Sequence, residues 1–198
     1  MIAGIGVLVV LVLLGVYVAS VYNRLVALFN RAQNAFAQID VQLKRRYDLI
    51  PNLVEIAKKY MQHEKETLLG VTNARNAARS ALEYATQNAD MKNIAKLNSA
   101  ESGLMNALKG LNVQMEAYPE LKANENMILL NDELATTENK IAFARQSYND
   151  GAMNFNVFKQ TFPCNVIAGM FPKYRDDMGL LEFEESRETL EKAPQIKF

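Results

Sequence analysis

The first 23 residues contain no charged side chain, and this feature constrains the fold of the chain more than any other. The segment from Ile2 to Tyr22 consists almost entirely of Val, Leu, Ile, Ala and Gly. About 20 apolar residues form an α-helix long enough to cross the roughly 30 Å hydrocarbon core of a bilayer. We therefore expect residues 1–23 to be a transmembrane anchor. The side chains expected to mark it are Ile2, Val9, Leu13, Tyr17 and Tyr22, and the two tyrosines are near the end where aromatic rings favour the lipid–water boundary.

A cleaved secretory signal is the alternative interpretation of this segment. Such a signal has a basic leader, an apolar stretch of about 7–15 residues and a cleavage site between small residues. Here no Lys or Arg precedes the apolar run, the run is longer, and Val18-Ala19-Ser20 is a poor cleavage site. We expect the segment to be retained.

Basic residues follow the apolar segment. Five of them lie between Arg24 and Arg46, against a single acid, Asp40. Positive charge is retained on the cytoplasmic side of a membrane, so we expect the C-terminal domain in the cytoplasm and the N-terminus outside. The single Cys fits a reducing compartment.

Beyond the anchor, apolar side chains recur every three or four residues, which is typical of amphipathic helices. The first stripe continues from the anchor to about Tyr47. Asp48 is then interpreted as the N-cap of a second helix with Pro51 in its first turn, where a missing N–H costs nothing, and with His63 on its apolar side. We expect helices from 1 to about 47, from the Asp48 cap to about 88, from 91 to 118, and from a cap at Asn124 or Asn126 to 162.

Four such helices with short connections predict an all-α fold, in which the transmembrane helix continues into an antiparallel up-down four-helix bundle. We expect an anchor (1–23), a cytoplasmic bundle (24–162), and an apolar and then acidic C-terminal tail (163–198). In this topology the fourth helix returns to the membrane. Segment 162–172 then either contacts the membrane-proximal end and its interface or merely covers the end of the bundle, and residues 176–198 form a solvated tail. The side chains expected to contact the membrane there are Phe158, Phe162, Phe171 and Tyr174.

Composition excludes several functions. Lys and Arg number 22, as do Asp and Glu, so no excess of positive charge indicates nucleic-acid binding. One Cys and one His exclude a disulfide framework and a multi-histidine metal site. The sequence His63-Glu64-Lys65-Glu66 lacks the second His of a zinc-protease motif, so His63 is interpreted as a core residue. We expect no catalytic residue, metal or cofactor.

The least generic residues form four groups, and their spacing covers the chain. They are IDVQLKRRYDLIPNLV at 39–54, Tyr60 with HEKE at 63–66, ANEN at 123–126, and ENKIAFARQSYND at 138–150. Together they resemble the LemA family of bacterial membrane proteins. The resemblance implies one N-terminal anchor, a cytoplasmic helical bundle and no established enzymatic activity. It also implies a link to membrane proteases, whose genes lie near those of some relatives, and to membrane remodelling through a magnetosome relative. Phe171-Pro172 departs from the Gly-Phe usual there, so we expect the membrane-proximal tail to differ in fold.

Charged and polar residues beside the helix contacts are expected to pair across helices and to fix their register. The residues assigned to this structural motif are Asp40, Arg45, Arg46, Asp48, Pro51, His63, Glu138, Arg145, Tyr148, Asn149 and Asp150.

These observations favour a single-pass scaffold of the bacterial inner membrane, which self-associates and organises or remodels the membrane without catalysis. The alternative is an adaptor or regulatory partner of a membrane protease or sensor kinase. The expected partners are the lipid bilayer and further copies of the chain, with no nucleic acid.

Overall fold

The computed structural model describes residues 2–182, which are almost entirely helical and contain no strand beyond an isolated bridge between Asp90 and Met178. The sequence prediction of an all-helical chain with an apolar N-terminal helix is confirmed. The helices are α1 (Ile2–Tyr60), α2 (Lys65–Gln87), α3 (Met91–Met115), α4 (Pro119–Lys122), α5 (Glu125–Gln160) and α6 (Cys164–Gly169), followed by the 3-10 helix η1 (Pro172–Tyr174).

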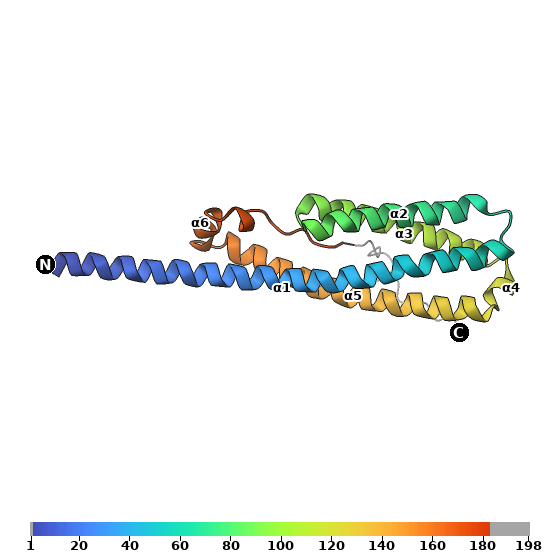
Figure 1. Ribbon diagram of the computed structural model, residues 1–198, viewed down its shortest axis with the longest axis horizontal. Helices are drawn as coiled ribbons and strands as arrows, with labels where there is room; N and C mark the ends of the chain where they lie inside the picture. Colours follow the sequence, from blue (N-terminus) through green and yellow to red (C-terminus); the bar gives the residue numbers. More distant parts are fainter. Residues whose placement is uncertain (1, 183–198) are drawn as a thin grey trace, which may run out of the picture.

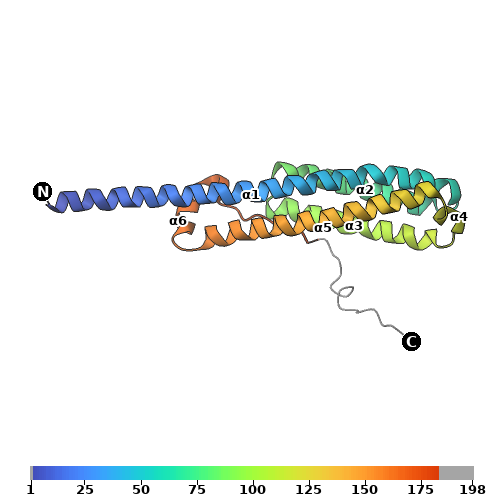
Figure 2. The same ribbon diagram turned by 90° about the horizontal axis from the view of Figure 1, so that it is seen from below.

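The helices form a long rod with α1 as its axis (Figure 1). α5 lies alongside α1, α2 and α3 lie side by side, and α2 also contacts α1. The α1–α2 turn and α4 lie at the end of the rod far from the N-terminus, and α6 lies beside α1 near the end of α5 (Figures 1 and 2). The N-terminal part of α1 extends beyond all the other elements. It is therefore the only described part of the rod without neighbours.

The contact between α1 and α5 is built on a seven-residue repeat. Side chains that recur every seven residues lie on one side of each helix, as in coiled coils. Gly151 of α5 allows the helices to approach closely, because an added Cβ would lie 3.2 Å from the Ala32 Cα of α1. The repeat runs through Leu25, Ala32, Ile39, Arg46 and Leu53 on α1, and through Met127, Leu134, Ile141, Tyr148 and Phe155 on α5, and all ten are buried or half-buried.

The predicted break between Tyr47 and Pro51 is wrong, because α1 continues through Pro51 to Tyr60. A proline inside a helix leaves the carbonyl four residues earlier without its N–H donor, at a cost of about 3 kcal/mol. Here that carbonyl belongs to Tyr47, and it accepts a hydrogen bond from Arg75 Nε of α2 at 2.8 Å. Leu53 and Ala57 beyond the proline are also buried, so packing favours continuation of the helix.

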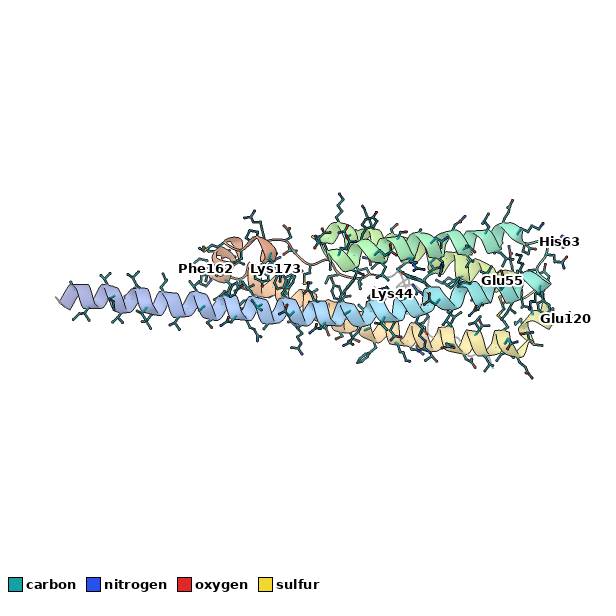
Figure 3. All side chains as sticks on the ribbon, viewed as in Figure 1. Lys44, Glu55, His63, Glu120, Phe162 and Lys173 are labelled. Carbon is teal, nitrogen blue, oxygen red and sulfur yellow. The ribbon has the colours of Figure 1, made fainter. Side chains whose placement is uncertain are left out.

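His63 is not the core histidine expected from the sequence. It lies exposed in the turn between α1 and α2, at the far end of the rod (Figure 3). The error follows from the predicted helix start, because the apolar stripe assigned to one helix is divided between α1 and α2. Asp48, predicted as an N-cap, lies instead within α1 and is exposed.

Other helix ends are closer to expectation. α2 ends at Gln87, and α5 is capped by Asn124, whose side chain accepts a hydrogen bond from the Met127 N–H at 3.1 Å. α3 ends three residues before the predicted Tyr118, and α5 ends two residues before the predicted Phe162. The prediction of a solvated tail is wrong for residues 176–182, because this segment contacts the helices. Residues 183–198 lie outside the described part of the chain.

We predict that Arg75→Ala lowers the free energy of unfolding by about 1–3 kcal/mol, because the Tyr47 carbonyl loses a charged donor. Arg79→Ala is the matched control: it removes an exposed arginine one turn further along α2 and should cost less than about 1 kcal/mol. Urea unfolding in mild detergent, followed by circular dichroism, measures both.

The interpretation also requires that Pro51→Ala reduce the cost of Arg75→Ala, since alanine restores an N–H that can reach the same carbonyl. An equal cost in the proline and alanine backgrounds would show that Arg75 does not act through this carbonyl.

Candidate membrane-facing end and interhelical network

The N-terminal part of α1 exposes apolar side chains all around its circumference. Among the described residues, α1 alone is long and apolar enough to cross a membrane by length and composition. Leu13 is 63% exposed and Tyr17 42%, whereas burial against other elements begins with the half-buried Val18 and is complete at Leu25. A helix that is apolar all around requires an apolar environment. The predicted anchor residues Val9, Leu13, Tyr17 and Tyr22 each have an exposed side chain.

A cluster of aromatic rings lies where the exposed part of α1 meets the rest of the rod. The Tyr22 ring lies 4.7 Å from the Phe171 ring, centroid to centroid, and 6.1 Å from the Tyr174 ring. Tyr174 also contacts Phe29 at 5.4 Å and is buried, which raises the pKa of its hydroxyl. Tyr174 therefore faces the protein and not lipid, contrary to the sequence expectation.

The other three predicted membrane-contact residues differ in exposure. Phe158 is half-buried, and Phe171 contacts Tyr22. Phe162 is 78% exposed. It lies in the connection between α5 and α6, on the side towards the N-terminal part of α1 (Figure 3). Segment 162–172 thus lies beside α1, at the end of the helical domain nearest the apolar N-terminal part, a position that both expected alternatives share.

A buried ion network joins α1, α3 and α5 in the half of the rod far from the N-terminus. Arg46 and Glu101 are both almost completely buried and form an ion pair. Arg46 Nη1 also donates to Glu138 Oε1 at 2.8 Å, and the Tyr47 hydroxyl donates to Glu101. Burial raises the pKa of Tyr47, which keeps this donor protonated. Arg46 and Glu138, both assigned to the structural motif without named partners, thus pair with each other, and Glu101 is a member of the network that the sequence did not identify.

The position of Arg46 explains the function of this network in the fold. It occupies one of the seven-residue repeat positions on α1, between Ile39 and Leu53, where every other repeat residue is apolar. A buried charge is costly unless it is paired, so any sliding of the helices that separates Arg46 from its carboxylates is strongly unfavourable. A polar residue at such a position sets the register of neighbouring helices. The network is structural, since it lies within a close-packed contact.

Most of the remaining motif residues lie nearer the surface, whereas Tyr148 is completely buried. Asp40 pairs with Lys44 at 2.7 Å and accepts a hydrogen bond from Thr86, and Arg45 pairs with Glu133 of α5. The Tyr148 hydroxyl donates to the Gly179 carbonyl at 2.8 Å. The structure also places Asp48 4.0 Å from Arg75, Arg145 half-buried on α5, and Asp150 exposed on α5.

Three asparagines hold residues 178–182 in an extended conformation between α3 and α5. The Asn156 side chain donates to the Met178 carbonyl at 2.8 Å and accepts from the Met178 N–H at 2.9 Å, and Asn149 makes the same pair of bonds with Leu181, both at 2.9 Å. The Asn98 side chain of α3 donates to the Leu180 carbonyl and accepts a hydrogen bond from the Glu182 N–H. These bonds replace those that a neighbouring β-strand would supply.

Two further features fix this segment. An added Cβ on Gly179 would lie 2.7 Å from the Ile94 Cβ of α3, so only glycine fits this close approach. Lys159 Nζ donates to the Arg175 carbonyl at 2.7 Å and pairs with Asp177 at 2.8 Å. The hydrogen bond from Lys159 lowers the pKa of Asp177. Sequence reasoning assigned Asn149 only to helix pairing and did not identify Asn98 or Asn156, although Asn149 and Asn156 are seven residues apart and share one side of α5.

The surface offers grooves rather than an enclosed cleft. One groove runs between α3 and α5 beyond the extended segment and includes Leu108, Asn112, Asn131 and Leu134. A second, between α1 and α5, includes Val41 and Phe143. Within residues 2–182 no three His, Cys, Asp or Glu side chains are grouped so that they could hold a metal ion.

The fold and the exposed apolar helix define a class of helical rods in which one continuous helix joins an apolar N-terminal part to a helical domain. Residues 35–198 match the model of the LemA family, so the chain belongs to this family and the expected resemblance is confirmed. The family and the apolar helix together indicate a membrane-anchored protein.

Curated relatives agree with this family. Protein LemA of Metamycoplasma hominis is 28% identical, over 77% of this chain and 65% of its own length. Magnetosome protein MamQ 2 of Paramagnetospirillum magneticum is 24% identical and Magnetosome protein MamQ of Magnetospirillum gryphiswaldense 23%, each over 74% of this chain and 60% of its own length. The similarity thus spans less than two thirds of the length of these relatives.

We predict that Asn149→Ala releases Leu181 from α5, because both backbone bonds to Leu181 are lost, whereas Asn156 still holds Met178. Amide hydrogen exchange at Leu181 should become faster by about ten-fold or more, which corresponds to the loss of roughly one net hydrogen bond. Asn131→Ala, an exposed asparagine on the same helix, is the control and should leave this amide unchanged. Unchanged protection of Leu181 in Asn149→Ala would refute the assigned role.

Proposed function

We propose that the protein is a non-enzymatic, single-pass membrane scaffold that self-associates and organises the membrane around it. The proposal includes a cytoplasmic domain in a bacterial inner membrane, an N-terminus outside, and four long helices acting as one antiparallel bundle. The excess of basic residues between Arg24 and Arg46 supports this orientation.

The observation that carries the proposal is the continuity of α1. Its 59 residues correspond to a helix of about 88 Å, and no loop separates the exposed apolar part from the part buried against α5. A flexible linker would let the domain rotate freely relative to the membrane. A continuous helix instead transmits the tilt of the anchor to the whole rod, which is what a scaffold requires of its attachment.

The surface between α1 and α5 supports self-association. Phe143 is 77% exposed and lines the same groove as Val41, which is 59% exposed. Large exposed apolar side chains that lie together favour a protein contact. The groove is formed by the two helices that run furthest along the rod, so a second copy on this face would align two rods lengthwise. Two of the relatives are named as magnetosome proteins, which supports a membrane-organising role here.

Native mass measurement in gentle detergent tests self-association. We expect the intact chain to form a defined oligomer and Phe143→Ser to shift it towards monomer, because the contact loses its largest apolar side chain. Val113→Ser is the matched control: it removes another exposed apolar residue, 68% exposed on α3, and should leave the oligomer intact.

A monomeric intact chain would refute the self-associating scaffold. If crosslinking in membranes instead recovered a heterologous protease or kinase in stoichiometric amount, the adaptor function would replace it.

A further inference from the structure

Three large apolar side chains in and beside α6 are mostly exposed. Phe162 is 78% exposed, Val166 61% and Met170 70%. Val166 and Met170 are four residues apart and therefore share one side of α6 and its last turn, and Phe162 lies in the turn that precedes the helix. The inner side is equally apolar: Cys164, Ile167 and Ala168 are buried. A segment that is apolar on both sides is unusual at a surface that faces water.

We propose that α6 is a second membrane contact, in which Phe162, Val166 and Met170 enter the boundary between headgroups and acyl chains of the cytoplasmic leaflet. This proposal rests on the proposed function, because it requires α1 to cross the bilayer. It deepens that function by adding an element that lies in the membrane surface beside the anchor.

The depth of α6 follows from its contacts with α1. Phe171, two residues after α6, contacts Tyr22 at a ring distance of 4.7 Å. Tyr22 lies at the end of the apolar part of α1, and Arg24 is its first charged side chain. The helix therefore lies level with the end of the anchor, where the bilayer surface must be if the anchor spans the membrane. Figure 3 shows Phe162 on the side of this region towards the N-terminal part of α1.

Continuity of the apolar surface favours lipid over a second protein. α6 contacts α1, and its Cys164 lies beside Tyr17. The α1 surface there is apolar and exposed, with Val16 63% and Tyr17 42% exposed. A lipid phase that covers the α1 surface therefore reaches the outer side of α6 with no further partner. Helices that lie in the membrane interface bury apolar side chains at the boundary between headgroups and acyl chains and keep basic residues in the headgroup region.

Basic side chains lie where such an element would meet headgroups. Lys173 and Arg175, which follow α6, and Arg24 of α1 are all exposed. Lys173 lies 5.0 Å from the centroid of the Phe29 ring, on the side of α6 that faces the rest of the rod (Figure 3). This places positive charge on the domain side and apolar side chains on the anchor side, the order that an anionic membrane surface requires.

Attachment at two points has a mechanical consequence. One spanning helix fixes a position in the membrane but leaves the rod free to turn about the helix axis. A second contact on one side of that axis removes the rotation and places extra volume in one leaflet only. The orientation of the α1–α5 face relative to neighbouring copies is then also fixed.

Depth-dependent fluorescence quenching in proteoliposomes tests the proposal. The full chain carries Cys164→Ser to remove its native thiol, and Val166→Cys carries an environment-sensitive dye. Vesicles of phosphatidylcholine and phosphatidylglycerol contain nitroxide lipids with the quencher near the headgroup or deep in the acyl chain. We expect blue-shifted emission from Val166→Cys and stronger quenching by the shallow nitroxide than by the deep one.

Val113→Cys, on α3, is the control, since it is 68% exposed but far from the anchor. The dye at this position should show the emission typical of water, and neither nitroxide lipid should quench it. Water-like emission from Val166→Cys in protein that floats with the vesicles would overturn the α6 proposal while leaving the anchor intact. Protein that does not float with the vesicles would instead contradict the proposed function itself.

Discussion

The structure depends on a single helix that meets two environments. Up to Tyr22 the side chains of α1 are apolar on every side, and from Leu25 onwards only one side is apolar. The change in pattern occurs without a break in backbone hydrogen bonding, so burial against α5 and transfer into lipid act on the same element. Because both favour the helical state, neither part of α1 needs a separate nucleus. The orientation of the domain follows directly from that of its first 22 residues.

Polar groups then determine how the other helices lie on α1. The repeat shared by α1 and α5 could by itself tolerate a slip of seven residues, since most of its positions are aliphatic. Arg46 removes this freedom by pairing with Glu101 of α3 and Glu138 of α5. Closer to the membrane, Asn98, Asn149 and Asn156 hold an extended segment between the same two helices. α3 and α5 are thus joined through a charge network in one part of the rod and through backbone bonds in another.

The sequence predicts the helices well because their apolar spacing is a local property. It places Arg46 and Glu138 in the structural motif because both lie beside apolar stripes, but it does not identify them as partners. It fails at Pro51, since the donor that satisfies the Tyr47 carbonyl comes from Arg75 on another helix and no local rule includes it. The misplacement of His63 follows from that failure. The extended segment was missed because its few residues have no periodicity, and because asparagine is more often a helix cap than a partner for distant backbone. Self-association, orientation and partners stay predictions.

Continuity of α1 through the membrane surface can be measured directly by spin labelling. Nitroxides are placed singly at residues 12–36 in a Cys164→Ser chain in proteoliposomes, and collision rates with oxygen and with a water-soluble nickel complex are compared. A continuous helix should give uniformly high oxygen access up to about Tyr17, and then a 3.6-residue oscillation with minima at Val21, Leu25 and Ala32 and no mobile gap. A stretch of mobile, water-accessible residues between the two regions would contradict a rigid link between membrane and domain.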